Sequence, residues 1–205
     1  MVKQERAGRT RRAVLLAAAD TFAGAGFEAA SLVDISRRAG VSKGALYFHF
    51  VSKQALADGV RAAAGREIGA AALRALRTED RAVQALIDFS HELARLLRED
   101  VVVRAGVRLG RQGLRLADGC AGPGTAWRSL AAVVQRLLER AERAGELRPG
   151  ADRRACAELL TAVVAGQVLL AAEEPGRPAP EAVRQLWAAA LPALVGPDDC
   201  PGYRV

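Results

Sequence analysis

The chain has 205 residues, of which 51% are hydrophobic and 26% charged, so it can bury a sizeable core and differs from disordered proteins. Isoleucine occurs only three times and aromatic residues make up 4%, a poor supply of strand formers that favours an all-α protein. Cys120, Cys156 and Cys200 are odd in number and lack a C-x-x-C spacing, which argues against a disulfide framework or a zinc site.

Neither a signal peptide nor a membrane span is expected. The first twelve residues are basic, and they are not followed by the apolar region and small-residue cleavage site of a signal peptide. The longest apolar stretch, Leu159–Ala172, is shorter than the ~20 residues that cross a bilayer. We therefore expect a cytoplasmic protein that makes no contact with a membrane.

The net charge of +7 is concentrated near the N-terminus. Residues 1–53 contain nine Lys and Arg against four Asp and Glu, a net +5 over a quarter of the chain. A small basic segment ahead of a nearly neutral one indicates a polyanionic partner for residues 1–53. A solvated basic face would give the same pattern.

The first predicted helix covers residues 10–25 and ends at Gly24 and Gly26. Ser31 starts the second, because Ser31-x-x-Asp34 is a capping-box pattern, and Gly40 stops it in a left-handed conformation.

Ser42 caps a short third helix, Lys43–His49, and Ser52 caps a long fourth one that runs to about residue 76. Two short capped helices around a tight glycine turn, with another helix across them, are typical of a helix-turn-helix unit. A generic helical hairpin would show the same spacing.

The rest of the chain predicts about five more helices, nine or ten in all. The expected segments are helices over 81–98 and 101–112, a loop over 113–124, a helix from about Trp127 to Gly145, a helix over 152–172, a linker over 175–180, a helix over 181–194 and a disordered tail over 196–205. Residues 152–172 are apolar on nearly every side, which predicts burial on two sides. On the last helix Val183, Leu186, Trp187 and Ala190 form an apolar stripe, which we expect to pair with a second copy of the chain.

The N-terminal motifs resemble one family. The segment Phe22–Phe27, Ser31 with Leu32 and Ile35, and above all the run from Gly40 to Lys53 are similar to the DNA-binding domain of TetR-family repressors. The segment Val103–Leu109, followed by Trp127, is similar to the γ-butyrolactone autoregulator receptors and pseudo-receptors of actinomycetes within that family.

The resemblance implies a homodimer with a helix-turn-helix DNA-binding domain over residues 1–53 and a ligand-binding and dimerisation domain over 54–195. Such a protein represses transcription on pseudo-palindromic double-stranded operator DNA until a small hydrophobic ligand binds, and it requires no cofactor. An alternative is a pseudo-receptor that answers an antibiotic or no ligand. The resemblance also implies control of secondary-metabolite genes.

Residues of the recognition segment are the expected DNA contacts: Gly44 and Ala45 are small enough for close approach to base edges, Lys43 can reach guanine or phosphate, and Tyr47 lies one turn further on. The full set of expected DNA-binding residues is Ser31, Ser42, Lys43, Gly44, Ala45, Tyr47, His49 and Lys53. Alternatively, Tyr47 and Phe48 belong to the core and Lys53 is a solvated helix start.

Two residues are candidates for the ligand site. Trp127 matches a pocket tryptophan of the receptors, although it also starts an apolar stripe and would fit a core position. Thr161 is a lone hydroxyl in an apolar helix and either orients a ligand or bonds back to a preceding carbonyl. His91 shares a helix face with polar residues and is expected to be solvated. No spacing indicates a catalytic or metal-binding constellation, so an enzyme is not expected.

Overall fold

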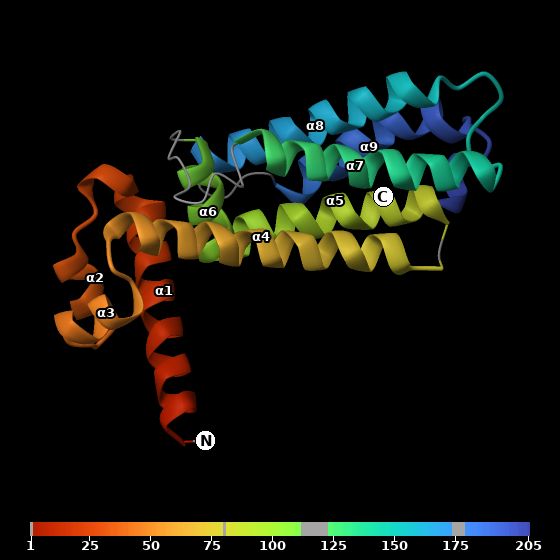
Figure 1. Cartoon of the computed structure of the whole chain (residues 1–205). Coiled ribbons are helices and arrows are strands. Elements are labelled where there is room, and N and C mark those ends of the chain that lie inside the picture. Colours follow the sequence, from red (N-terminus) through yellow and green to blue (C-terminus); the bar gives the residue numbers. More distant parts are fainter. Residues whose placement is uncertain (1, 80, 112–122, 174–178) are drawn as a thin grey trace. The chain divides into compact units, whose positions relative to one another are not determined.

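The computed structural model describes residues 2–79, 81–111, 123–173 and 179–205. These residues form nine α-helices and one short 3-10 helix and contain no strand, so the all-α prediction is confirmed. The helices are α1 (Val2–Ala29), α2 (Leu32–Arg38), α3 (Lys43–His49), α4 (Lys53–Arg77), α5 (Ala82–Glu99), α6 (Val101–Arg111), α7 (Pro123–Arg143), α8 (Arg153–Glu173), α9 (Pro180–Val195) and η1 (Cys200–Gly202) (Figure 1). The predicted loop over 113–124 and the linker over 175–180 fall largely outside the described residues.

The chain divides into two compact units. The first unit comprises residues 1–67 and 100–123, and the second unit comprises 68–99 and 124–205. The boundary thus differs from the one expected at residue 53, because the first half of α4 and all of α6 pack with the N-terminal helices. The chain crosses from one unit to the other three times: within α4, between α5 and α6, and at the start of α7.

The core of the first unit explains this division. Val14, Ala18 and Phe22 of α1 are buried together with Leu56 and Val60 of α4, and Ala105 and Leu109 of α6 complete the cluster. The apolar stripe of α1 is too wide for the two short helices α2 and α3 to cover. Helix α6 covers the rest, which is why a segment far along the chain belongs to this unit.

Helix α1 is longer than the sequence predicts, and it is broken. It starts at Val2 instead of residue 10, and it runs past Gly24 to Ala29 with Gly26 in a non-helical conformation (φ 81°, ψ 175°). That φ is strained for any residue with a Cβ, so glycine is required at this break. Gly40, with φ 64°, ends α2 in the left-handed conformation expected from the sequence.

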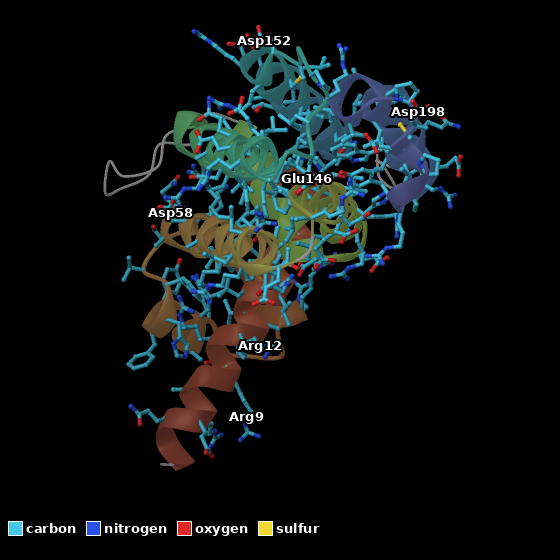
Figure 2. The ribbon with its side chains drawn as sticks, turned by 90° about the vertical axis from the view of Figure 1, so that its right-hand side faces the viewer. Arg9, Arg12, Asp58, Glu146, Asp152 and Asp198 are labelled. Atoms are coloured by element: carbon cyan, nitrogen blue, oxygen red, sulfur yellow. The ribbon has the colours of Figure 1, made fainter. Side chains whose placement is uncertain are left out.

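In the second unit α8 and α9 pack on α5. The Glu146 carboxylate accepts hydrogen bonds from the backbone N–H groups of Ala82 (2.7 Å) and Val83 (3.0 Å) and so caps the start of α5. Glu146 lies in the turn after α7 and is labelled in Figure 2. This cap joins two segments that are 64 residues apart in the chain.

The C-terminal residues 196–205 are ordered, so the prediction of a disordered tail is wrong. Tyr203 is buried, and its hydroxyl donates a hydrogen bond to the Glu146 carboxylate at 3.3 Å. The centre of its ring lies 3.9 Å from the Arg81 guanidinium. The Gln84 side chain exchanges two hydrogen bonds with the backbone of Arg204, at 2.9 and 3.0 Å. Polar partners distant in sequence therefore hold a segment whose own composition indicates no structure.

His91 is half-buried, contrary to the solvated position expected. Its Nε2 is inaccessible to solvent and has no hydrogen-bond partner among the described residues, and burial is the largest cause that lowers the pKa of its imidazole. The position is buried because α9 covers this side of α5, a contact that helical spacing along α5 alone does not reveal.

Helix α8 carries an uncovered apolar side. Leu160, Val164 and Val168 are buried, whereas Leu159, Leu169 and Leu170 are exposed, so burial on two sides is not found in a single chain. Residues 153–171 are as long and apolar as a membrane-crossing helix, but core helices of globular proteins satisfy the same test, and α8 packs on α5.

Candidate nucleic-acid interface

The first unit presents α3 to solvent in the way a reading helix requires. The Ser42 hydroxyl accepts a hydrogen bond from the Ala45 N–H (3.1 Å), and Ser31 does the same for Val33 (3.2 Å), so both predicted caps are confirmed. Only Leu46 of α3 is buried. The rest of this helix is therefore available to a partner.

Lys43, Gly44 and Tyr47 lie together on the exposed side of α3. The Lys43 ammonium is 5.9 Å from the centre of the Tyr47 ring, and the tyrosine is 41% exposed. Lys43 and Gly44 are exposed and Ala45 is half-buried. One side of this short helix therefore carries a cation, a phenol and residues without bulky side chains. This combination is suited to contacts with base edges in a major groove.

Phe48, which like Tyr47 could have belonged to the core, is 82% exposed. Its ring meets the half-buried His49 edge-on at 5.2 Å between centroids. The core interpretation of Tyr47 and Phe48 is therefore wrong. The signal was present in the sequence, because Leu46 and Phe50 at i and i+4 define the buried side and place residues 47 and 48 away from it.

Lys53 occupies a different environment from the one expected of a phosphate contact. Its ammonium donates to the backbone carbonyls of Glu28 (3.1 Å) and Ala30 (3.3 Å) and lies 4.6 Å from the centre of the Phe27 ring. Lys53 therefore binds the end of α1, a role that sequence spacing does not show. The phosphate contact stays a prediction.

The basic residues of α1 add positive charge to the first unit. Arg9 and Arg12 are exposed on the N-terminal half of α1, and their side chains project from the helix (Figure 2). Arg11 is also exposed, with its guanidinium 5.1 Å from the centre of the Phe50 ring next to α3. The positive charge thus continues from the recognition segment along α1.

The second unit contains an apolar groove between α5, α8 and α9 with a volume of about 220 Å³. Leu86, Leu160, Leu186 and Ala190 are among its lining residues, and Trp187 at its base donates a hydrogen bond to the Ser90 hydroxyl at 2.6 Å. Trp187 and Val183 are buried within the chain, so of the predicted stripe Leu186 is the large residue left exposed.

Of the two predicted ligand residues, Thr161 has a side chain in the described part of the chain. Thr161 is half-buried on α8 and does not line the groove. Trp127 belongs to the first turns of α7, and its side chain lies outside the described residues. Within the described residues, no three His, Cys, Asp or Glu side chains gather in a way that could hold a metal ion.

Comparisons with known proteins agree on both parts of the chain. Residues 14–60 match bacterial regulatory proteins of the tetR family, and residues 80–196 match the tetracyclin repressor-like C-terminal domain. The A-factor receptor protein of Streptomyces griseus is 33% identical over 198 residues, which are 96% of this chain and 68% of that protein.

Two solved structures show the same fold. A γ-butyrolactone receptor described as an ArpA-like protein is 29% identical, with a TM-score of 0.76 over 94% of this chain and 92% of the other. CprB from Streptomyces coelicolor, in complex with its biological operator sequence, is 30% identical, with a TM-score of 0.79 over 95% and 92%. The chain therefore belongs to the TetR family of bacterial regulatory proteins and is related to the γ-butyrolactone receptors.

Proposed function

We propose that this protein is a DNA-binding transcriptional repressor that a small hydrophobic signal of the γ-butyrolactone type releases from its operator, and that it controls secondary-metabolite genes. The observation that carries the proposal is the exposed side of α3, where Lys43, Gly44 and Tyr47 lie together in a basic unit. The operator complex of the related CprB supports the same use of this unit. The protein acts in the cytoplasm, on the nucleoid when bound.

In the proposed complex α3 enters the major groove. Gly44 and Ala45 let the backbone approach the bases, and Lys43 and Tyr47 read base edges. His49 and the two cap serines, Ser31 and Ser42, contact the DNA backbone, while the arginines of α1 add sequence-independent attraction to phosphates. We expect Phe48, fully apolar and exposed, to lie against the sugar or a thymine methyl group.

Two reading units are needed for an operator of ordinary length. We propose that the exposed leucines of α8 and Leu186 of α9 pair with their counterparts in a second copy, so that α8 and α9 of both chains form a four-helix interface. The twofold symmetry of this dimer predicts a pseudo-palindromic operator with half-sites about 34 Å or more apart.

Sequencing the genomic DNA fragments that the purified protein retains tests DNA binding directly. We expect enrichment of one inverted repeat. Lys43→Ala and Tyr47→Ala should each weaken operator binding by about 1–3 kcal/mol and relax sequence preference, with the exposed Gln4→Ala on α1 as the matched control. Retention of unrelated fragments, or of a single unrepeated half-site, would contradict the proposal.

The ligand part of the proposal is supported by the relationship to γ-butyrolactone receptors. We propose Trp127 and Thr161 as residues of the ligand pocket. An alternative is a pseudo-receptor repressor that answers an antibiotic or no ligand. The isoelectric point of about 10.1 favours this alternative, because the resemblance to this group implies that its basic members are often pseudo-receptors. A panel of butyrolactones and antibiotics added to the preformed operator complex separates the two functions by which compounds release DNA.

A further inference from the structure

Backbone carbonyl groups around the break in α1 bind two cationic side chains from other helices. Gly26 interrupts the helix, and the chain resumes for only three residues before Ser31 starts α2. Residues 23–30 thus form the end of α1 and its connection to α2. Carbonyl groups at a helix end carry partial negative charge and attract cations.

Arg108 of α6 supplies one cation. Its Nη1 donates to the carbonyl oxygens of Ala23 and Gly24, the latter at 3.1 Å, just before the break. Ala105 and Leu109 anchor the same helix in the core of the first unit. The guanidinium is therefore held by a rigid element and is not a freely moving surface side chain.

Lys53 at the start of α4 supplies the second cation, on the other side of the break. It binds the carbonyl oxygens of Glu28 and Ala30 while its ammonium lies on the Phe27 ring. Charge-assisted hydrogen bonds and a cation–π contact at one ammonium restrict its geometry. Lys53 and Arg108 together bind the carbonyls on both sides of Gly26.

We propose that Lys53 and Arg108 are positioning residues that hold the broken end of α1 and so fix where α2 and α3 lie relative to α1. The proposal rests on the proposed function of the first unit in DNA binding. Each cation comes from a helix that the chain connects directly to the second unit, since α4 continues beyond residue 67 and α6 follows α5. The two helices thereby act on the DNA-reading segment through these four carbonyls.

The test compares Lys53→Gln and Arg108→Gln with the conservative Lys53→Arg and Arg108→Lys. Exposed Arg66→Gln on α4 is the control for loss of one positive charge from the same unit. Each Gln variant should weaken operator binding by roughly ten- to a hundredfold, and each conservative variant should weaken it less. The double variant Lys53→Gln/Arg108→Gln should weaken binding by less than the product of the two single effects.

Two readouts separate positioning from phosphate contact. A phosphate contact by Lys53 would lower the slope of log K against log salt by about 0.9 in Lys53→Gln. The predicted phosphate contact of Lys53 can itself lower this slope, so hydrogen exchange in the free protein is the readout of positioning. We expect the amides of residues 27–33 to exchange hydrogen faster in both Gln variants. The conservative variants should restore the slow exchange.

Unchanged exchange in residues 27–33 in either Gln variant would overturn the proposal, whereas a lowered slope in Lys53→Gln would add a phosphate contact to the positioning role. The exchange measurement uses free, full-length protein, so its result stands even if no operator is found. Failure of the wild-type protein to bind DNA would instead refute the proposed function. The exchange measurement would still test whether Lys53 and Arg108 hold the end of α1.

Discussion

The contact between α4 and α6 in the first unit predicts the effect of a single methyl group. A Cβ added to Gly106 of α6 would lie 2.4 Å from the Cβ of Ala64 on α4, and both atoms belong to rigid helix positions. Ordinary carbon contacts lie about 3.5–4.0 Å apart, so Gly106→Ala must move the helices apart by roughly 1 Å or more. No flexible side chain can absorb this change.

Two effects of opposite sign determine the magnitude. Alanine is favoured over glycine inside a helix by about 1 kcal/mol, whereas overpacking a core costs typically about 1–3 kcal/mol. We therefore expect Gly106→Ala to lower the free energy of unfolding by about 1 kcal/mol, with a melting temperature lower by roughly 2–4 °C. Thermal unfolding followed by far-ultraviolet circular dichroism measures this change.

Two controls isolate the contact. Gly65→Ala, in α4 beside Ala64, adds a methyl group with nothing within 4 Å and should stabilise the protein through helix propensity alone. The swap Gly106→Ala with Ala64→Gly exchanges the methyl group across the crossing and should restore wild-type stability within about 0.5 kcal/mol. If Gly106→Ala stabilises as much as Gly65→Ala does, the close crossing of α4 and α6 is refuted.

Four further outcomes follow from other parts of the chain. Leu186→Asp should make the protein monomeric in sedimentation while leaving its helix content unchanged, since Leu186 is exposed on α9; a persistent dimer would exclude this surface. Tyr203→Ala should destabilise the protein by about 2–4 kcal/mol in chemical denaturation, because the buried phenol supports the Glu146 cap of α5, and an effect near zero would show that the tail adds no stability. Burial lowers the pKa of His91 in the folded protein, so the unfolded chain takes up the additional proton first and the free energy of unfolding should fall as the pH drops below about 6.5. His91→Phe should lessen this dependence. If both proteins lose stability equally with falling pH, His91 is not the group responsible. Trp127→Ala should keep operator affinity within a few fold but abolish ligand release, whereas loss of folding would make Trp127 a core residue.

The sequence alone determined the parts of the fold that depend on local physics. Apolar residues at helical spacing, the cap serines 31, 42 and 52, and Gly40 predicted the helix-turn-helix, and the structure shows each cap bond where it was expected. These interactions join residues at most a few positions apart, so they can be recognised from spacing. The exposed side of α3 follows from the same periodicity.

Tertiary structure decided the features whose partners are distant in the chain. Lys53 binds the end of α1 across a separation of 25 residues, and Arg108 does so across 85. The ordering of residues 196–205 requires Gln84 and Glu146, and the burial of His91 requires α9. A cation at a given position is equally suited to a phosphate and to a backbone carbonyl, because both present partially or fully negative oxygen atoms. Which oxygen it meets is determined only when packing brings the helices together.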